Sequence, residues 1–246
     1  MKRITVVSGA AAVLMAGVCG TQAQISLEEI ALSVDGTLGD FFKPFTGADV
    51  PSGAGANFGG FSVNTGLGII KIVISAPGTH SVVTFFDHDI DLAPNGYINE
   101  VGFAIGSPAA GQSWEIDEPG FGAKGYTGNI FDHVQSSTSS SSDLDNSVGT
   151  NNPDDVSMAL GETFVLGAGD VATVTFSLST TKPAGFYLDQ NDPDSGKDIY
   201  FTSKTLIVNG HTGGPGVPET GTTLFALMIG VVGLAAFNYK FGSRAV

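Results

Sequence analysis

Two stretches of this sequence alternate apolar and polar side chains with a period of two. In residues 70–75 isoleucine fills every second position, and in residues 173–179 Val174, Phe176 and Leu178 alternate with threonine and serine. Successive side chains of a β-strand point to opposite faces, so this spacing buries one face and exposes the other. The two stretches therefore predict strands that each cover one side of a core.

Other short segments are typical of strands, and clusters of Gly, Pro, Asn and Asp separate them. These candidate strands are residues 58–63, 80–86, 98–105, 113–116, 156–160, 163–166, 185–188 and 198–208. Many short strands at this spacing predict an all-β fold, an antiparallel β-sandwich of jelly-roll-like form. Only residues 26–32 and the two end segments have a helical pattern.

The sandwich is expected to span residues 24–212 as one domain. Residues 35–60 are rich in Gly, Pro and Phe and are expected to be loose. Residues 136–152 contain a run of serines followed by polar residues with little to bury, which indicates a flexible loop within the domain.

The N-terminus has the organisation of a secretory signal peptide. A basic start, Met1-Lys2-Arg3, precedes an apolar stretch over residues 4–18, and small residues lead up to Ala23. Cleavage after Ala23 would remove residues 1–23. Because Cys19 is the chain's single cysteine, the mature protein would have neither a disulfide nor a thiolate.

The C-terminus predicts a membrane anchor. The apolar run over residues 224–237 is short, but its extension to 221–239 reaches the roughly 17–25 residues that a membrane-spanning helix needs. Tyr239 would lie at the interface, and Lys240 and Arg244 form a basic end that favours the cytoplasmic side.

The tail over residues 213–246 resembles the sorting signal of PEP-CTERM proteins, which exosortases process. The matching residues are Val217, Pro218, Glu219, Thr220 and Gly221, then the apolar run, then Lys240 and Arg244. The resemblance implies an exosortase-like partner at the inner membrane and a final place at the cell surface or in the extracellular matrix of a biofilm, with exopolysaccharide as a further partner. Two alternatives remain: a sortase signal, in which Val217 replaces leucine, and an anchor that is never cut.

Three blocks of the ectodomain, residues 111–117, 153–161 and 185–195, also resemble an uncharacterised group of PEP-CTERM ectodomains. That resemblance covers about residues 82–206 and implies no known activity.

The charge balance restricts the partners. The chain has 24 acidic and 10 basic residues, a formal net charge of −14. Such a surface repels nucleic acid and attracts cations, so no nucleic-acid partner is expected.

Two acidic segments are candidates for calcium. Asp189, Asn191, Asp192 and Asp194 place oxygen ligands close together before Gly196, although the register is not that of an EF-hand and an acidic turn explains the same letters. In the segment 87–91, the three aspartates would share one face of a strand, where either a cation or solvent would stabilise them.

Trp114 is a candidate for sugar binding, since an exposed indole stacks on sugar rings, but a place in the core explains it too. Neighbouring Glu115 and Glu118 would suit glycoside hydrolysis only if they faced each other across a cleft. The four histidines, His80, His88, His133 and His211, show no zinc-binding spacing.

No catalytic motif stands out, so the sequence favours a protein that is not an enzyme. We expect an exported structural or adhesive component of the cell surface. The alternatives are a carbohydrate-binding module or carbohydrate-active enzyme, and a calcium-dependent adhesin.

Overall fold

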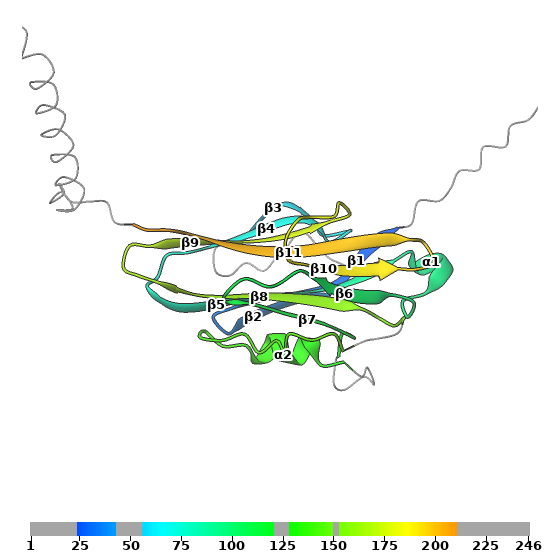
Figure 1. Cartoon of the computed structure of the whole chain (residues 1–246), viewed down its shortest axis with the longest axis horizontal. Helices are drawn as coiled ribbons and strands as arrows, with labels where there is room; N and C mark the ends of the chain where they lie inside the picture. Colours follow the sequence, from blue (N-terminus) through cyan, green and yellow to red (C-terminus); the bar gives the residue numbers. More distant parts are fainter. Residues whose placement is uncertain (1–23, 43–55, 121–127, 150–152, 211–246) are drawn as a thin grey trace, which may run out of the picture.

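Two antiparallel sheets, packed face to face, form the protein in the computed structural model (Figure 1). The structure describes residues 24–42, 56–120, 128–149 and 153–210. No helix within these four ranges is long and apolar enough to cross a membrane.

Sheet A has five strands and sheet B has six. Sheet A runs in the order β2 (Thr37–Phe42), β1 (Ile25–Val34), β5 (Gly78–Ile90), β8 (Ser157–Leu166) and β7 (Gln112–Asp117). Sheet B runs in the order β3 (Ala56–Ser62), β4 (Leu67–Ile74), β9 (Val171–Ser179), β11 (Lys197–Val208), β10 (Tyr187–Asp192) and β6 (Val101–Ile105). The sequence-based prediction of an all-β sandwich is confirmed.

The main core lies between the inner faces of the two sheets. Phe86 of sheet A meets Phe201 of sheet B edge to face, with ring centroids 5.1 Å apart, and Phe176 packs against Phe201 at 6.1 Å. All three rings are fully buried. Burial of such side chains stabilises the fold by about 1.5–3 kcal/mol each.

A third layer covers the outer face of sheet A. Helix α2 (Ile130–Ser136) lies beneath the strand layer that contains β5 and β8, as Figure 1 shows. The buried members of this second cluster are Ala31, Val83, Phe85, Ile130, Val134, Leu144 and Ala159. Phe85 also meets Phe131 edge to face at 5.8 Å. The only other described helix is the single turn α1 (Leu92–Asn95).

The prediction of a helix over residues 26–32 is wrong. These residues lie in β1, which pairs with β2 on one side and β5 on the other. A register shift between Leu27 and Glu29 sets the core residues Leu27 and Ile30 three positions apart, and Ala31 is buried on the opposite face. Its sequence therefore lacks the period-two pattern that identifies a strand.

Two segments that were expected to be loose carry ordered contacts. Strand β2 and most of β3 fall within residues 35–60. In the serine-rich segment, Ser137 is buried and its hydroxyl donates to the His133 carbonyl at 2.9 Å, and Leu144 packs on sheet A. The predicted signal peptide and transmembrane helix lie outside the described residues.

Candidate metal centre

Glu115 is a buried carboxylate on the outer face of sheet A. Within β7, Trp114 and Ile116 pack on the main core, so Glu115 between them points the other way, toward α2. Its residue surface is only 1% exposed. Burying a carboxylate is costly unless other groups hydrogen-bond to it, so its partners are informative.

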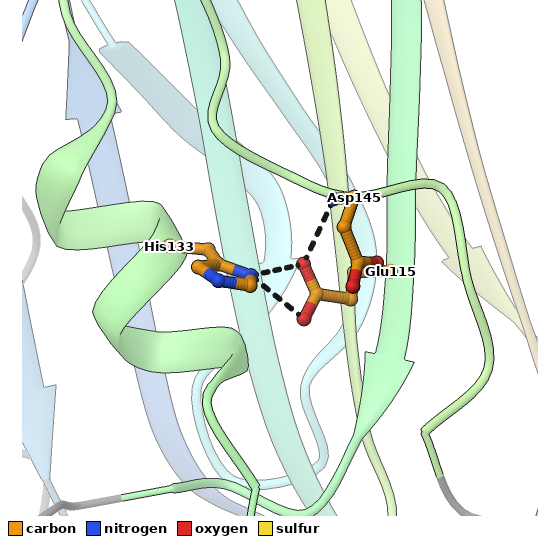
Figure 2. Close-up of side chains that lie close together, drawn as sticks. All are labelled: Glu115, His133 and Asp145. Carbon is orange, nitrogen blue, oxygen red and sulfur yellow. Dashed lines mark hydrogen bonds and ion pairs between the residues drawn. The ribbon is translucent and has the colours of Figure 1, made fainter.

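The first partner is His133 of α2. Its Nδ1 lies 2.8 Å from Oε2 of Glu115 and 2.9 Å from Oε1 (Figure 2). On the other side of the ring, Nε2 lies 3.2 Å from the side-chain amide nitrogen of Asn129. Since an amide nitrogen only donates, the consistent tautomer carries its proton on Nδ1 and accepts at Nε2.

The second partner is Asp145, in the segment that follows α2. Its backbone N–H donates to Oε2 of Glu115 at 3.2 Å. The backbone and hydroxyl of Ser147 hold the Asp145 carboxylate, donating at 3.1 Å and 2.6 Å. Asp145 is exposed, so this side of the group is open to solvent.

Burial and hydrogen bonding have opposite effects on the pKa values of Glu115 and His133. Burial raises the pKa of Glu115, and the hydrogen bonds from His133 and from the Asp145 N–H offset that effect only in part. Burial alone would lower the pKa of His133, but the hydrogen bond and the charge of Glu115 outweigh it, so this pKa is raised. The hydrogen bond and charge of Glu115 thus favour a proton on the His133 ring, and the tautomer above places that proton on Nδ1, between the two groups.

Glu115, His133 and Asp145 can each offer one ligand atom to the same point. One imidazole nitrogen and two carboxylate oxygens all lie within 4.8 Å of one another. Figure 2 shows the three side chains arriving from a strand, a helix and a connecting segment. An imidazole with two carboxylates suits Zn²⁺ or Mn²⁺, whereas Ca²⁺ takes oxygen ligands almost exclusively.

The four residues predicted to bind calcium do not converge. Alternation along β10 places Asp189 and Asn191 on the outer face of sheet B and buries Asp192 on the inner side. Asp192 Oδ1 accepts from the backbone N–H of Asp194 and of Ser195, at 2.8 Å and 3.2 Å. It therefore caps the turn between β10 and β11, which is the acidic-turn interpretation.

The aspartates of residues 87–91 lie at the end of sheet A. Asp87 and Asp89 belong to β5, while Asp91 follows the strand with a left-handed backbone, φ 59°. Burial, followed by the charges of Asp155 and Asp89, raises the pKa of Asp87 well above its usual value. Burial, then Asp89, raises the pKa of Asp155 to about 7.

Glu100 extends this acidic end toward the core. Its side chain accepts from the Ile90 N–H at 2.8 Å and contacts the Gln190 amide. Burial raises the pKa of Glu100 to about 9, which keeps it protonated at neutral pH.

Trp114 and Glu115 cannot form one sugar site, because they lie on opposite faces of β7. Trp114 is partly buried against the main core and contacts Phe186, with ring centroids 6.1 Å apart. Glu118 follows the end of β7 and interacts with Asp154. The arrangement shows Trp114 as a core residue.

The other described histidines have structural surroundings. His80 Nδ1 lies 2.8 Å from Asp35 Oδ2, and its Nε2 lies 2.8 Å from the Ala76 carbonyl. His88 is fully buried, and burial lowers its pKa to about 4. His211 lies outside the described residues, as do Ala23, Val217, Pro218, Glu219, Thr220, Gly221, Lys240 and Arg244.

In the sequence, Glu115 and His133 belong to separate candidate sites, and no pattern singles out Asp145. Their spacing matches no metal motif, because the three residues come together only when α2 packs on β7. The short apolar pattern of Ile130 and Val134, four residues apart, is the one signal that could have predicted α2.

Comparison of the chain with protein-family models, with curated proteins and with solved structures found no match.

Proposed function

We propose that this protein is an exported structural module of the cell surface or extracellular matrix, in which a divalent metal fastens the α2 layer to the sandwich. The observation that carries this proposal is the convergence of Glu115, His133 and Asp145, with one ligand atom each within 4.8 Å. A single ion would join β7, α2 and the segment after α2, which are separate in the sequence.

The donor set indicates which metal to test first. Zinc sites commonly combine histidine with carboxylates, and three protein ligands leave a fourth position for water. Zinc bonds of about 2.0–2.2 Å at tetrahedral angles would set the His133 nitrogen and a Glu115 oxygen about 3.4 Å apart. The two atoms now lie 2.8 Å apart, so binding needs the loss of one proton and a shift of about 0.6 Å.

A structural role explains the placement better than a catalytic one. Glu115 is enclosed beneath α2 and already accepts hydrogen bonds from two segments, so it is positioned to hold a layer rather than to meet a substrate. Asp145 remains exposed and gives the ion a path from solvent. We therefore assign no enzymatic activity.

The cellular location in this proposal is inferred from the two ends of the sequence. Export through the inner membrane, handling by an exosortase-like enzyme at Val217–Gly221 and a final place beside exopolysaccharide are all inferred from the resemblance of the tail. The jelly-roll-like form of the sandwich, the two terminal helices and calcium at Asp189, Asn191, Asp192 and Asp194 stay predictions.

Calorimetric titration with Zn²⁺ tests the metal centre in the full-length protein purified without a polyhistidine tag. We expect one ion per chain, and we expect His133→Gln and Asp145→Asn to weaken binding at least about tenfold, a change of about 1.4 kcal/mol. His80→Gln is the matched control, because it alters the other described histidine–carboxylate pair. Binding that is equal in all four proteins, or absent from the wild type, would refute the centre.

Export and processing of the two termini have a separate test. Mass spectrometry of the protein recovered from its native host should show a new N-terminus after Ala23 and a C-terminus cut near Pro218. Pro218→Ala should leave the tail intact. An untrimmed chain in the cytosol would contradict export and would leave the metal measurement unaffected.

A further inference from the structure

A pocket opens between the two sheets, on the inner side of β7 and β8 rather than on the face that carries Glu115. Its volume is about 490 Å³, within the range of about 300–1,000 Å³ that small-molecule sites occupy. Glu162 of β8 and Thr202–Thr205 of β11 line it from opposite sheets. Two connecting segments complete the wall, one containing Ala109 and the other Pro183.

A carboxylate held by a hydrogen-bond network lines this pocket. Glu162 is 7% exposed, and it accepts from the hydroxyl of Ser203 at 2.6 Å and from that of Thr205 at 2.9 Å. The side-chain amide of Gln112 donates to the Ser203 hydroxyl at 2.7 Å and to Glu162 at 3.4 Å. These contacts fix the positions of all four side chains.

The network leaves hydrogen-bonding capacity for a ligand. A carboxylate can accept about four hydrogen bonds, and Glu162 receives three from the described residues. The remaining acceptor position requires a donor, such as a hydroxyl group. Because the network already holds the carboxylate, little conformational entropy would be lost when the donor binds.

The other lining groups point to a neutral ligand with hydroxyls and an apolar face. Glu162 would repel an anionic ligand, and Lys204 does not offset this charge, because its register opposite Thr175 places its side chain on the outer face of sheet B. Phe186 adds a half-buried aromatic ring that also contacts Trp114, with ring centroids 6.1 Å apart. Sugars combine these properties, since their hydroxyls lie around the ring edge and their C–H groups form an apolar face.

We propose that this pocket binds one ring of a neutral carbohydrate, with a sugar hydroxyl donating to Glu162 and the ring packing on Phe186. The role of Trp114 is then indirect, because it contacts Phe186 and does not itself touch the sugar. The proposal does not depend on the metal centre, which lies on the other face of sheet A.

Saturation-transfer NMR and calorimetry on the full-length protein test the proposal, in a detergent without a sugar headgroup and with EDTA present. The probes are glucose, galactose, mannose and N-acetylglucosamine, each titrated to about 20 mM to reach millimolar affinities. We expect at least one probe to bind the wild type. Glu162→Gln and Ser203→Ala should weaken that binding at least about tenfold, since each removes or loosens a hydrogen bond to a charged group.

Two further variants keep the test decisive. Phe186→Ala should also weaken binding, and it decides the matter if Glu162→Gln fails to fold. Ser177→Ala is the matched control, because Ser177 lies on the outer face of the same sheet in β9, away from the pocket. Absence of binding by every probe, equal binding by the pocket variants and the wild type, or an equal loss in Ser177→Ala would each overturn the proposal.

Discussion

The two outer faces of the sandwich differ in what covers them. Helix α2 and the segment after it cover the outer face of sheet A, where Phe85 is fully buried and Glu115 is 1% exposed. The outer face of sheet B carries Val73 and Leu206, which are 50% and 57% exposed. Within the described residues, sheet A therefore lies between two packed layers, while sheet B borders only the main core.

The two faces also differ in charge. The acidic end of sheet A gathers Asp87, Asp89 and Asp155, whose charges act on one another. On sheet B, Lys71 and Lys204 flank Thr175 across three neighbouring strands. Asp189 of β10 also lies on the outer face of sheet B, where it is partly exposed, whereas Glu115 on sheet A is buried beneath α2 and can hold a metal there.

The two outer faces should differ most in the free energy of unfolding that is lost when one apolar side chain on each is truncated. Phe85→Ala should lower the free energy of unfolding by about 3–5 kcal/mol, because it opens a cavity beneath α2. Val73→Ala should cost less than about 1 kcal/mol, because half of that side chain is already in water. Urea unfolding followed by circular dichroism measures both, and equal losses would show that α2 does not cover sheet A.

Glu100 should make the stability of the acidic end depend on pH. Its pKa is about 9 in the folded protein against 4.5 ordinarily, so between these values the folded state holds a proton that the unfolded state lacks. The free energy of unfolding then falls as pH rises, by about 1.4 kcal/mol per pH unit. His88 acts in the opposite direction, but only between about pH 4 and 6.5, because its pKa is lowered.

Between pH 7 and 9 Glu100 should carry the largest part of the change, because this interval lies above the pKa of Asp155, about 7, while Asp87, whose pKa is also raised, adds to the fall. Wild-type stability should fall by about 2–3 kcal/mol across this interval, and Glu100→Gln should remove most of that fall. Chemical unfolding at four pH values in EDTA measures the slope. The assignment fails if the variant keeps the wild-type slope.

Without a metal, the hydrogen bond between Glu115 and His133 should contribute a smaller amount to the free energy of unfolding. In EDTA at pH 7, His133→Ala should lower the free energy of unfolding by about 1–2 kcal/mol, because the buried Glu115 carboxylate loses its side-chain hydrogen-bond donor. Asp35→Asn weakens the corresponding bond to His80, where the Asp35 side chain is 33% exposed, and should cost less. Thermal melting compares the two, and a larger loss in Asp35→Asn would reverse this ranking.

The smallest effect is expected on the open face. Lys71→Ala should change the free energy of unfolding by less than about 0.5 kcal/mol, because the side chain is exposed and no described segment packs over it. A loss above about 1 kcal/mol in the same urea assay would indicate that another part of the chain covers sheet B.

The contrast between the faces also explains which strands could be predicted. Strands β4 and β9 were visible in the sequence because their outer residues are polar or exposed, which preserves the period-two pattern. In β1 the register shift between Leu27 and Glu29 breaks this pattern and spaces Leu27, Ile30 and Ala31 as in a helix. Helix α2 has only seven residues, too few for a clear helical period.

The candidate site was harder to predict for the same reason. Glu115 is adjacent to Trp114 in the sequence, which suggested a shared sugar site, yet alternation along β7 separates them. His133 and Asp145 reach Glu115 only through the packing of α2, which no local pattern specifies. The acidic run at Asp189–Asp194 looked like a site but serves mainly to form a turn.

Amide hydrogen exchange with and without Zn²⁺ tests the central claim most directly. If a metal fastens the helical layer to sheet A, saturating Zn²⁺ should slow exchange in α2 and around Asp145 by at least about tenfold and leave β9 unchanged. His133→Gln should abolish that protection, and His80→Gln should retain it. Exchange in α2 that is the same with Zn²⁺ as with EDTA would contradict the account.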